Sequence, residues 1–187
     1  LQDEHGIAPT DEMRVAMYAH AANGGIKIDK TAQTGAEGLY ACGEATGGMH
    51  GADRIGGLSS ANGIVFGRIA GASAALEAQK EPETALKADI ALPQYGIATT
   101  DAERLTHSLK HTMSTYCMIN RTEAGLSEAL HELEGLKTEA TTLRTQKAQD
   151  SEVAALARLQ SQIQLAQEMV KAMRKRTESL GSHYRAD

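Results

Sequence analysis

The sequence predicts an α/β segment followed by an all-α three-helix bundle. Most of the 18 glycines lie ahead of residue 80, whereas residues 97–187 are poor in glycine, contain no proline and are rich in alanine, leucine and charged residues. Aromatic residues make up 3% of the chain, and tryptophan is absent. This composition favours closely packed helices and glycine-rich turns over a β-sandwich with aromatic cross-strand pairs.

The change in composition places a domain boundary between Pro82 and Pro93. Both prolines and the nearby Gly96 interrupt helical patterns, so the stretch between them is predicted to be a linker. We therefore expect one domain over residues 1–82 and a second over residues 97–187.

Two short strands are expected in the first domain, joined by a turn-rich connection. Residues 25–29 alternate apolar and polar side chains, and residues 38–43 form a short apolar run suited to a buried strand. A glycine-rich loop follows, and a helix is expected to begin at Ser59. The apolar face of this helix is predicted to include Ile64, Val65, Ile69, Ala72 and Leu76.

The second domain shows helical periodicity over residues 100–119, 122–145 and 150–179. In the last stretch apolar residues recur at steps of three and four, and Asp150 or Ser151 is available as the amino-terminal cap. The stripe expected to be buried is Val153, Leu156, Leu159, Ile163, Leu165, Met169 and Met173. Three such helices in succession predict an antiparallel bundle.

Charge and hydropathy argue against several classes of protein. The formal net charge is -5 and no basic face occurs along the chain, so nucleic acid is not an expected partner. No run approaches the roughly 20 apolar residues that cross a bilayer, and the amino terminus has no signal-peptide pattern. Cys42 and Cys117 lie far apart without a CxxC motif, so neither a metal site nor a disulfide framework is expected. A reducing cytoplasm fits this cysteine usage best.

The loop over residues 43–60 carries the strongest indication of a ligand. Its glycines let the backbone approach a bound molecule closely, and the helix that follows presents free N–H groups that favour an anion. Glu44, directly after an expected strand, is placed as a ribose-hydroxyl acceptor would be in an α/β nucleotide site. Neither a Walker-type phosphate loop nor a GxGxxG motif occurs. The alternative is a glycine-rich turn that serves only to reverse the chain.

Arg54 and His20 are the candidate side chains for binding an acidic substrate. A guanidinium in the middle of such a loop is costly to bury unless a carboxylate or phosphate meets it, and its planar fork suits a carboxylate. His20 precedes the first expected strand and is expected to approach the same loop. The alternatives are a structural salt bridge of Arg54 with Asp53 or Glu44, and an ordinary hydrogen-bonded role for His20.

Five segments of this sequence resemble motifs of the fumarate reductase, succinate dehydrogenase and L-aspartate oxidase flavoproteins, in the same order over nearly the whole chain. The segments are residues 20–26 (similar to HYxMGG), 38–44 (GLYAAGE), 50–57 (HGANRLGG), 65–71 (VFGRxAG) and 176–187 (RxESRGxHYRxD). The resemblance implies that residues 1–82 complete an FAD-binding, Rossmann-like domain and that residues 97–187 form the helical domain after it.

The cofactor implied by the resemblance is FAD. Glu44 would take the ribose of FAD, and Ser59 and Ser60 at the helix start would meet the pyrimidine edge of the isoalloxazine ring. Reduced flavin builds negative charge at that edge, which a helix amino terminus stabilises.

The activity implied by the resemblance is FAD-dependent oxidation or reduction of a dicarboxylate such as fumarate or succinate. Hydride would pass between the flavin and a carbon next to a carboxylate, with His20 and Arg54 as catalytic and substrate-binding side chains. The Gly57 backbone would lie nearby. Asp53 stands where the motif has Asn, and Leu58 where Asn is frequent, so the substrate pocket is expected to differ from that of the family pattern.

The partners implied are an amino-terminal polypeptide or segment with the rest of the FAD-binding and capping domains, an iron–sulfur electron-transfer subunit and the small dicarboxylate. Through its partners the protein would be peripheral on the inner face of a membrane. Because Leu1 is not methionine and the pattern from Glu4 already resembles the middle of a domain, we expect a fragment or a split subunit. The alternative is a non-catalytic structural or binding subunit that has kept the flavoprotein scaffold and lost the chemistry.

Overall fold

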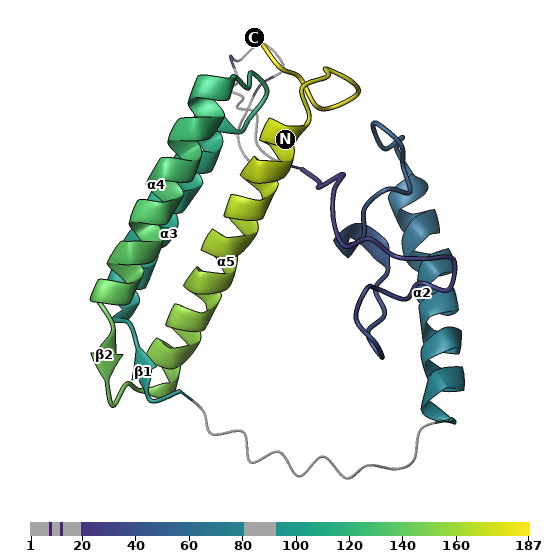
Figure 1. The fold of residues 1–187 in the computed structure, drawn as a ribbon, viewed down its shortest axis with the longest axis horizontal. Helices are drawn as coiled ribbons and strands as arrows, with labels where there is room; N and C mark the ends of the chain where they lie inside the picture. The colour runs from purple at the N-terminus through teal and green to yellow at the C-terminus, as the bar shows by residue number, and fades with distance from the viewer. Residues whose placement is uncertain (1–7, 9–11, 13–19, 81–92) are drawn as a thin grey trace.

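The computed structural model describes residues 8, 12, 20–80 and 93–187, so the predicted linker lies almost wholly outside the described residues. The elements in chain order are a 3-10 helix η1 (Gly43–Ala45), α2 (Leu58–Ala78), β1 (Tyr95–Gly96), α3 (Thr99–Tyr116), α4 (Glu123–Thr142), β2 (Thr145–Gln146) and α5 (Asp150–Lys175). Helices α3, α4 and α5 pack together as a bundle, while η1, α2 and the loops around them form a separate body (Figure 1).

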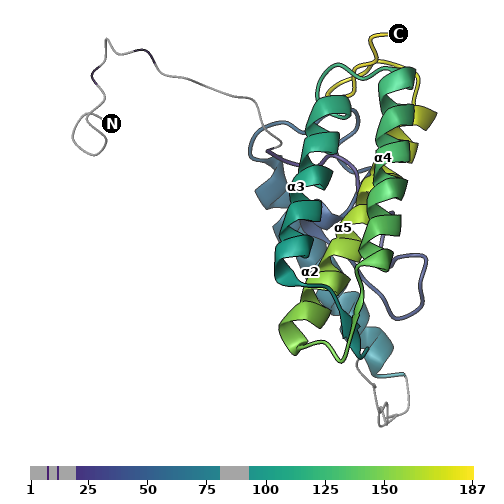
Figure 2. The same ribbon diagram turned by 90° about the vertical axis from the view of Figure 1, so that its left-hand side faces the viewer.

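The three helices predicted for the second region are confirmed, each ending three or four residues earlier than the periodicity indicated. Each of them packs against the other two, and Figure 2 shows the three side by side. Among the described residues, the largest fully buried side chains all belong to this core: Ile97, Leu105, Leu126, Leu133, Leu159, Ile163 and Val170. A closed apolar core of this kind supplies most of the driving force for folding.

The buried stripe of α5 differs in part from the predicted one. It agrees over the first half of the helix, but Leu165 is 62% exposed and Met169 is 39% exposed. Ala166 and Val170 occupy the buried positions instead. Steps of three and four from Ile163 keep these two residues on the face that meets α3 and α4, whereas Leu165 lies off it.

The amino-terminal cap of α5 is Gln149, so the prediction of Asp150 or Ser151 was wrong. The Gln149 side chain accepts a hydrogen bond from the Glu152 backbone, and the Glu152 carboxylate accepts the Gln149 N–H at 2.9 Å. This reciprocal pair is a capping box. Asp150 then lies inside the first turn, where its negative charge interacts favourably with the helix dipole.

A two-residue antiparallel ladder between β1 and β2, which the sequence did not predict, closes one end of the bundle. Its strands are too short to show an alternating pattern. Gly96 lies so close to α5 that an added Cβ would sit 2.5 Å from the carbonyl carbon of Glu152. The neighbouring Ile97 is fully buried and donates its N–H to the Glu152 carbonyl at 3.2 Å.

The two strands predicted in the first region are not formed, so that expectation was wrong for the described chain. Each segment makes one isolated bridge: Ile26 pairs in parallel with Thr46, and Tyr40 pairs antiparallel with Gln33. An extended segment becomes a strand only when a neighbour satisfies a row of its N–H and C=O groups. These segments have no such neighbour among the described residues, and Ile26 is 46% exposed.

Helix α2 presents apolar side chains that no described residue covers. It begins at Leu58, one residue before the predicted start, and packs against η1. Its buried residues are Asn62 and Ala70, while Ile64 is 74% exposed and Leu76 is 59% exposed. Three residues of the predicted apolar face, Ile64, Val65 and Leu76, are therefore exposed in the described structure.

Candidate functional site

Close backbone contacts fix the start of the glycine-rich loop. Gly43 has a φ of 70°, and the turn that it begins is closed by the Thr46 N–H donating to the Gly43 carbonyl at 3.1 Å. Ile26 donates its N–H to the Ala45 carbonyl at 2.8 Å. The crossing requires glycine at residue 25, because a Cβ on Gly25 would lie 2.4 Å from the Ala45 oxygen. The segment that leads into the first predicted strand is thereby held against the loop.

Glu44 lies exposed in η1, and its carboxylate binds the segment just after His20. Its Oε1 accepts the N–H of Ala22 at 2.9 Å. Its Oε2 has no hydrogen-bond partner within the part of the chain that the structure describes. A carboxylate with one oxygen held and the other open can accept a hydroxyl group from a ligand.

Arg54 lies partly buried in the middle of the loop. Its backbone N–H donates to Asp53 Oδ1 at 2.8 Å. Its guanidinium makes no ion pair with Asp53, Glu44 or any other described residue. The structural salt bridge considered from the sequence is therefore not formed, and the guanidinium is free to meet an anion.

A cluster of three polar side chains joins the segments of His20 and Arg54 to the C-terminal segment. The Nδ2 of Asn23 donates one hydrogen to Asp53 Oδ1 and the other to Ser182 Oγ, both at 2.9 Å. The structure thus brings the two predicted substrate-binding segments together, without a direct hydrogen bond between His20 and Arg54 among the described residues. Sequence reasoning missed Asn23 and Ser182. The available signal was that Asn23 stands where HYxMGG has methionine.

The helix after the loop begins without a side-chain cap. Gly57 precedes it with a φ of 86°, and the Leu58 N–H donates to the Ile55 carbonyl at 3.2 Å. Ser59 and Ser60 follow, both exposed, in a first turn whose N–H groups have no intrahelical partner. Such a helix start favours a negatively charged group.

Asn62, one position after this turn, leaves a buried polar atom without a partner. The residue is 8% exposed, and its Nδ2 lies 3.2 Å from His50 Nε2 and 3.5 Å from the Gly43 oxygen. Its Oδ1 is buried and finds no donor in the described part of the protein. Buried carbonyl oxygens in native proteins nearly always accept a hydrogen bond. A donor from outside the described residues is therefore expected to bind this oxygen.

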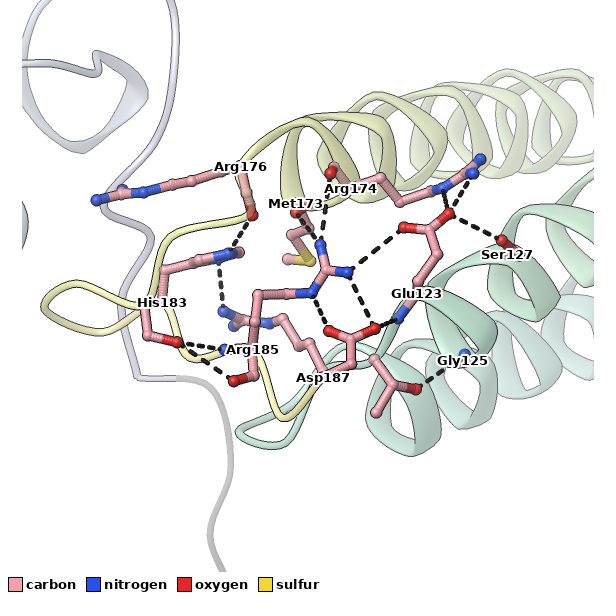
Figure 3. Close-up of polar contacts among 12 residues, drawn as sticks. Glu123, Gly125, Ser127, Met173, Arg174, Arg176, His183, Arg185 and Asp187 are labelled. Atoms are coloured by element: carbon pink, nitrogen blue, oxygen red, sulfur yellow. Dashed lines mark hydrogen bonds and ion pairs between the residues drawn. The ribbon is translucent and has the colours of Figure 1, made fainter.

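The C-terminal segment folds back over one end of the bundle (Figure 3). The Arg185 side chain, 5% exposed, donates to Asp187 Oδ1 at 2.9 Å and lies 3.4 Å from Glu123 Oε2. Its remaining N–H groups reach the carbonyls of Met173 and Arg174 at the end of α5. One buried guanidinium thus joins the start of α4 to the end of α5. The same guanidinium lowers the pKa of the Asp187 carboxyl, with the Glu123 N–H adding to the effect.

His183 is held as a neutral ring in the same segment. Its Nε2 lies 2.9 Å from the Arg176 carbonyl and its Nδ1 lies 3.1 Å from Arg121 Nη1. Since a carbonyl only accepts and a guanidinium only donates, Nε2 carries the proton and Nδ1 is the acceptor. Burial lowers the pKa of His183, and the nearby guanidinium groups act in the same direction.

Gly181 brings the C-terminal segment against the loop that carries Arg54. It has a φ of 62°, and an added Cβ would lie 2.2 Å from the Ala52 oxygen. Any other residue would therefore be strained in its own backbone and would push the segment away from Ala52. The close approach places Ser182 beside Asn23.

Comparisons with known proteins agree with the motifs. A family model described as fumarate reductase flavoprotein C-term matches residues 106–187, and one described as FAD binding domain matches residues 2–60. An FAD-dependent oxidoreductase from Methanocaldococcus jannaschii is 33% identical over 183 residues, which cover 95% of this chain and 34% of that protein. An L-aspartate oxidase from Acinetobacter baylyi is 33% identical over 199 residues, which cover 98% of this chain and 34% of that protein.

Solved structures of flavoproteins also resemble this chain in fold. A chain of E. coli quinol fumarate reductase superimposes with a TM-score of 0.83 at 27% identity, covering 100% of this chain and 34% of that chain. This chain therefore spans about a third of the length of the relatives that it matches.

The glycine-rich loop, the start of α2 and the α3–α4–α5 bundle agree with the carboxyl-side part of a flavoprotein. The chain belongs to the fumarate reductase, succinate dehydrogenase and L-aspartate oxidase family of flavoproteins, as the resemblance implied. Family members are FAD-dependent oxidoreductases, and FAD is the cofactor that the matches indicate. In the described residues no helix is both long and apolar enough to cross a bilayer.

The residues present fit such a cofactor. The uncapped start of α2 offers N–H groups to the electron-rich edge of a flavin, and Glu44 has a free acceptor oxygen for a hydroxyl group. Asn62, whose Oδ1 has no partner among the described residues, lies in α2, and its Nδ2 lies 3.5 Å from the Gly43 oxygen at the start of the loop.

Proposed function

We propose that this chain is a component of an FAD-dependent oxidoreductase that acts on a dicarboxylate such as fumarate or succinate. The observation that carries the proposal is the Arg54 guanidinium, which is partly buried in the loop yet unpaired among the described residues. When bound, FAD supplies hydride exchange with a carbon next to a carboxylate. The chain's own residues bind and orient the two reactants.

In this proposal Arg54 grips one carboxylate of the substrate. A guanidinium presents two parallel N–H groups that match the two oxygens of a carboxylate, which fixes the orientation of the substrate as well as holding it. His20 provides a second donor to the same substrate, and the Gly57 backbone lies at the helix start beside the loop. Glu44 holds the segment that follows His20 through the Ala22 N–H.

The cofactor contacts proposed for this chain lie at the two ends of the loop. Glu44 accepts a hydroxyl group of the FAD ribose through its free oxygen. Ser59 and Ser60 meet the pyrimidine edge of the flavin with the N–H groups of the first turn of α2. Their effect is electrostatic, because the helix start stabilises the negative charge that reduction places at that edge.

The rest of the flavoprotein is proposed to cover α2. Its exposed apolar side chains, such as Ile64 and Val65, suit burial against an amino-terminal segment or polypeptide with the remaining FAD contacts. An iron–sulfur subunit as electron-transfer partner, and attachment to the inner face of a membrane through partners, belong to the same proposal. They are supported by the similarity to a quinol fumarate reductase.

Arg54→Lys in the FAD-loaded protein tests the proposal most sharply. Lysine keeps the charge and loses the bidentate fork, so we expect kcat/KM to fall by about 2–4 kcal/mol of transition-state stabilisation. His20→Ala should act in the same direction, with a loss on the order of 10²-fold. Turnover per bound flavin and the melting temperature are measured together for each variant.

The matched control is Arg158→Lys, an exposed arginine on α5. We expect that variant to keep both its turnover per flavin and its melting temperature. If Arg54→Lys and His20→Ala lose thermal stability while turnover per bound flavin stays at the wild-type value, neither residue belongs to the active site.

A further inference from the structure

We propose that Asn23 and Ser182 are positioning residues for Arg54, so that the C-terminal segment helps to shape the carboxylate-binding loop. The inference deepens the proposed function and rests on Arg54 binding a carboxylate. It is carried by the cluster in which the Asn23 amide donates both to Asp53 and to Ser182, the latter 159 residues further along the chain.

Asp53 is engaged by donors other than the guanidinium of Arg54. Its carboxylate is adjacent in sequence to Arg54 and has the chemistry to pair with that guanidinium. Its Oδ1 instead accepts two other donors, Asn23 Nδ2 at 2.9 Å and the Arg54 backbone N–H at 2.8 Å. These two donors engage Oδ1, and Asp53 forms no ion pair with the Arg54 guanidinium among the described residues, so the guanidinium is left to the ligand.

Asn23 is itself held by two hydrogen bonds. An amide NH₂ has two hydrogens, and here one goes to Asp53 and the other to Ser182. With both donated, the amide plane has a defined orientation. Loss of the Ser182 acceptor would leave the Asn23 side chain with one anchor and a freer rotation.

Ser182 lies on a turn that close backbone contacts hold in place. Gly181 meets the Ala52 oxygen so closely that no Cβ fits, and the turn from Leu180 to His183 is closed by two backbone hydrogen bonds at 2.9 and 3.2 Å. His183 anchors the far side of this turn to Arg121 and Arg176. The serine hydroxyl is therefore presented to Asn23 by a fixed turn.

Two of the three residues in this cluster differ from the residues that the family motifs have at the same positions. Asn23 stands in place of methionine in HYxMGG and Asp53 in place of asparagine in HGANRLGG, while Ser182 occupies the variable position of RGxHYR. Residues that differ from the pattern thus touch one another. The geometry assigns them a shared task in this protein, which is to set the angle at which Arg54 meets a carboxylate.

The test measures malonate binding to the FAD-loaded protein through the change in flavin absorbance. We expect Asn23→Ala to raise the dissociation constant of malonate about tenfold and Ser182→Ala about three-fold, because each removes a hydrogen bond that orients the loop. Ser182→Thr restores the hydroxyl and should recover most of the affinity. Ser114→Ala, an exposed serine on α3, is the matched control and should leave binding unchanged.

Gly181→Ala is the second route to the same answer, should Asn23→Ala fail to load FAD. It moves the turn from Ala52 and should weaken malonate binding at least as much as Ser182→Ala does. The inference is overturned if Arg54→Ala weakens malonate at least tenfold while the cluster variants bind it within twofold of wild type. If Arg54→Ala itself binds malonate normally, the proposed substrate site is wrong and the inference falls with it.

Discussion

At the scale of single residues, the C-terminal segment places a neutral ring and a charged guanidinium side by side. Arg185 keeps its charge because Asp187 and Glu123 both face it. His183 is uncharged, because burial disfavours its protonated form and Arg121 already donates to Nδ1. A proton on Nδ1 would face the N–H of Arg121, which is also a donor, and the hydrogen bond would be lost. Protonation of His183 should therefore destabilise the fold.

We therefore predict that acid weakens the protein through His183. The folded-state pKa of this ring lies below its ordinary value of 6.5. As pH falls below 6.5 the unfolded chain takes up a proton that the folded chain refuses, so the free energy of unfolding decreases over that interval. Urea unfolding from about pH 7 to about pH 5 measures the slope.

His183→Gln keeps a donor and an acceptor but does not titrate, and this variant should lose part of the slope. His131→Gln, on the exposed face of α4, is the control and should retain it. The carboxyls of Asp187 and Glu123, whose pKa values are lowered, act at more acidic pH and lie outside the measured interval. An identical slope in wild type and His183→Gln would contradict the assignment.

The sequence indicated Arg54, His20 and Glu44 as candidate side chains, but not the groups that contact their segments. Arg54 and Glu44 could be proposed because a charged side chain within a glycine-rich loop suggests a ligand, and His20 because it precedes the first expected strand. Asparagine and serine are common polar residues that attract no attention in the sequence. Their role depends on the hydrogen bond that joins them across the chain. A contact between residues 23 and 182 depends on how the two bodies pack, which local patterns do not report.

At the scale of elements, long periodic helices were predicted well and short extended segments were not. Each helix of the bundle carries its own repeating apolar pattern, which fixes the element whatever its surroundings. The segments around Ile26 and Tyr40 need neighbours to become strands, and no pattern within the segment supplies them. The β1–β2 pair was missed because two-residue strands are too short to show an alternating pattern, and their pairing depends on the surrounding helices.

A pair of glycine substitutions tests the packing of β1 on α5. Gly96→Ala places a methyl group 2.5 Å from the Glu152 carbonyl carbon, and since the obstacle is backbone, we expect a loss of about 1–3 kcal/mol in unfolding free energy. Gly135→Ala lies in α4 with nothing within 4 Å of the new methyl, and should stabilise by about 0.5–1 kcal/mol. Denaturant unfolding of both variants gives the comparison, and equal stabilities would show that β1 does not pack tightly on α5.

At the scale of the whole molecule, the two bodies differ in how complete they are. The bundle encloses its own core from three helices. The first body buries Ala32, Thr46, Asn62 and Ala70 and leaves the apolar side chains of α2 exposed. The contact of the C-terminal segment with the loop ties the incomplete body to the complete one.

The isolated 187-residue chain should therefore bind FAD weakly. In the proposed site its loop contacts the ribose and the flavin ring, while the sequence holds no GxGxxG to receive the pyrophosphate. Titration of the purified chain with FAD, followed by flavin fluorescence, measures the affinity. A submicromolar dissociation constant would show that the chain carries a complete cofactor site.

The visible absorption spectrum of the native protein that contains this chain tests the central claim most directly. The protein is purified, reduced with dithionite and then mixed with fumarate. The account predicts flavin bands in the oxidised protein, their loss on reduction and their return on addition of fumarate, with a much slower return in Arg54→Lys. A protein without flavin bands, or one whose reduced flavin is indifferent to dicarboxylates, would contradict it.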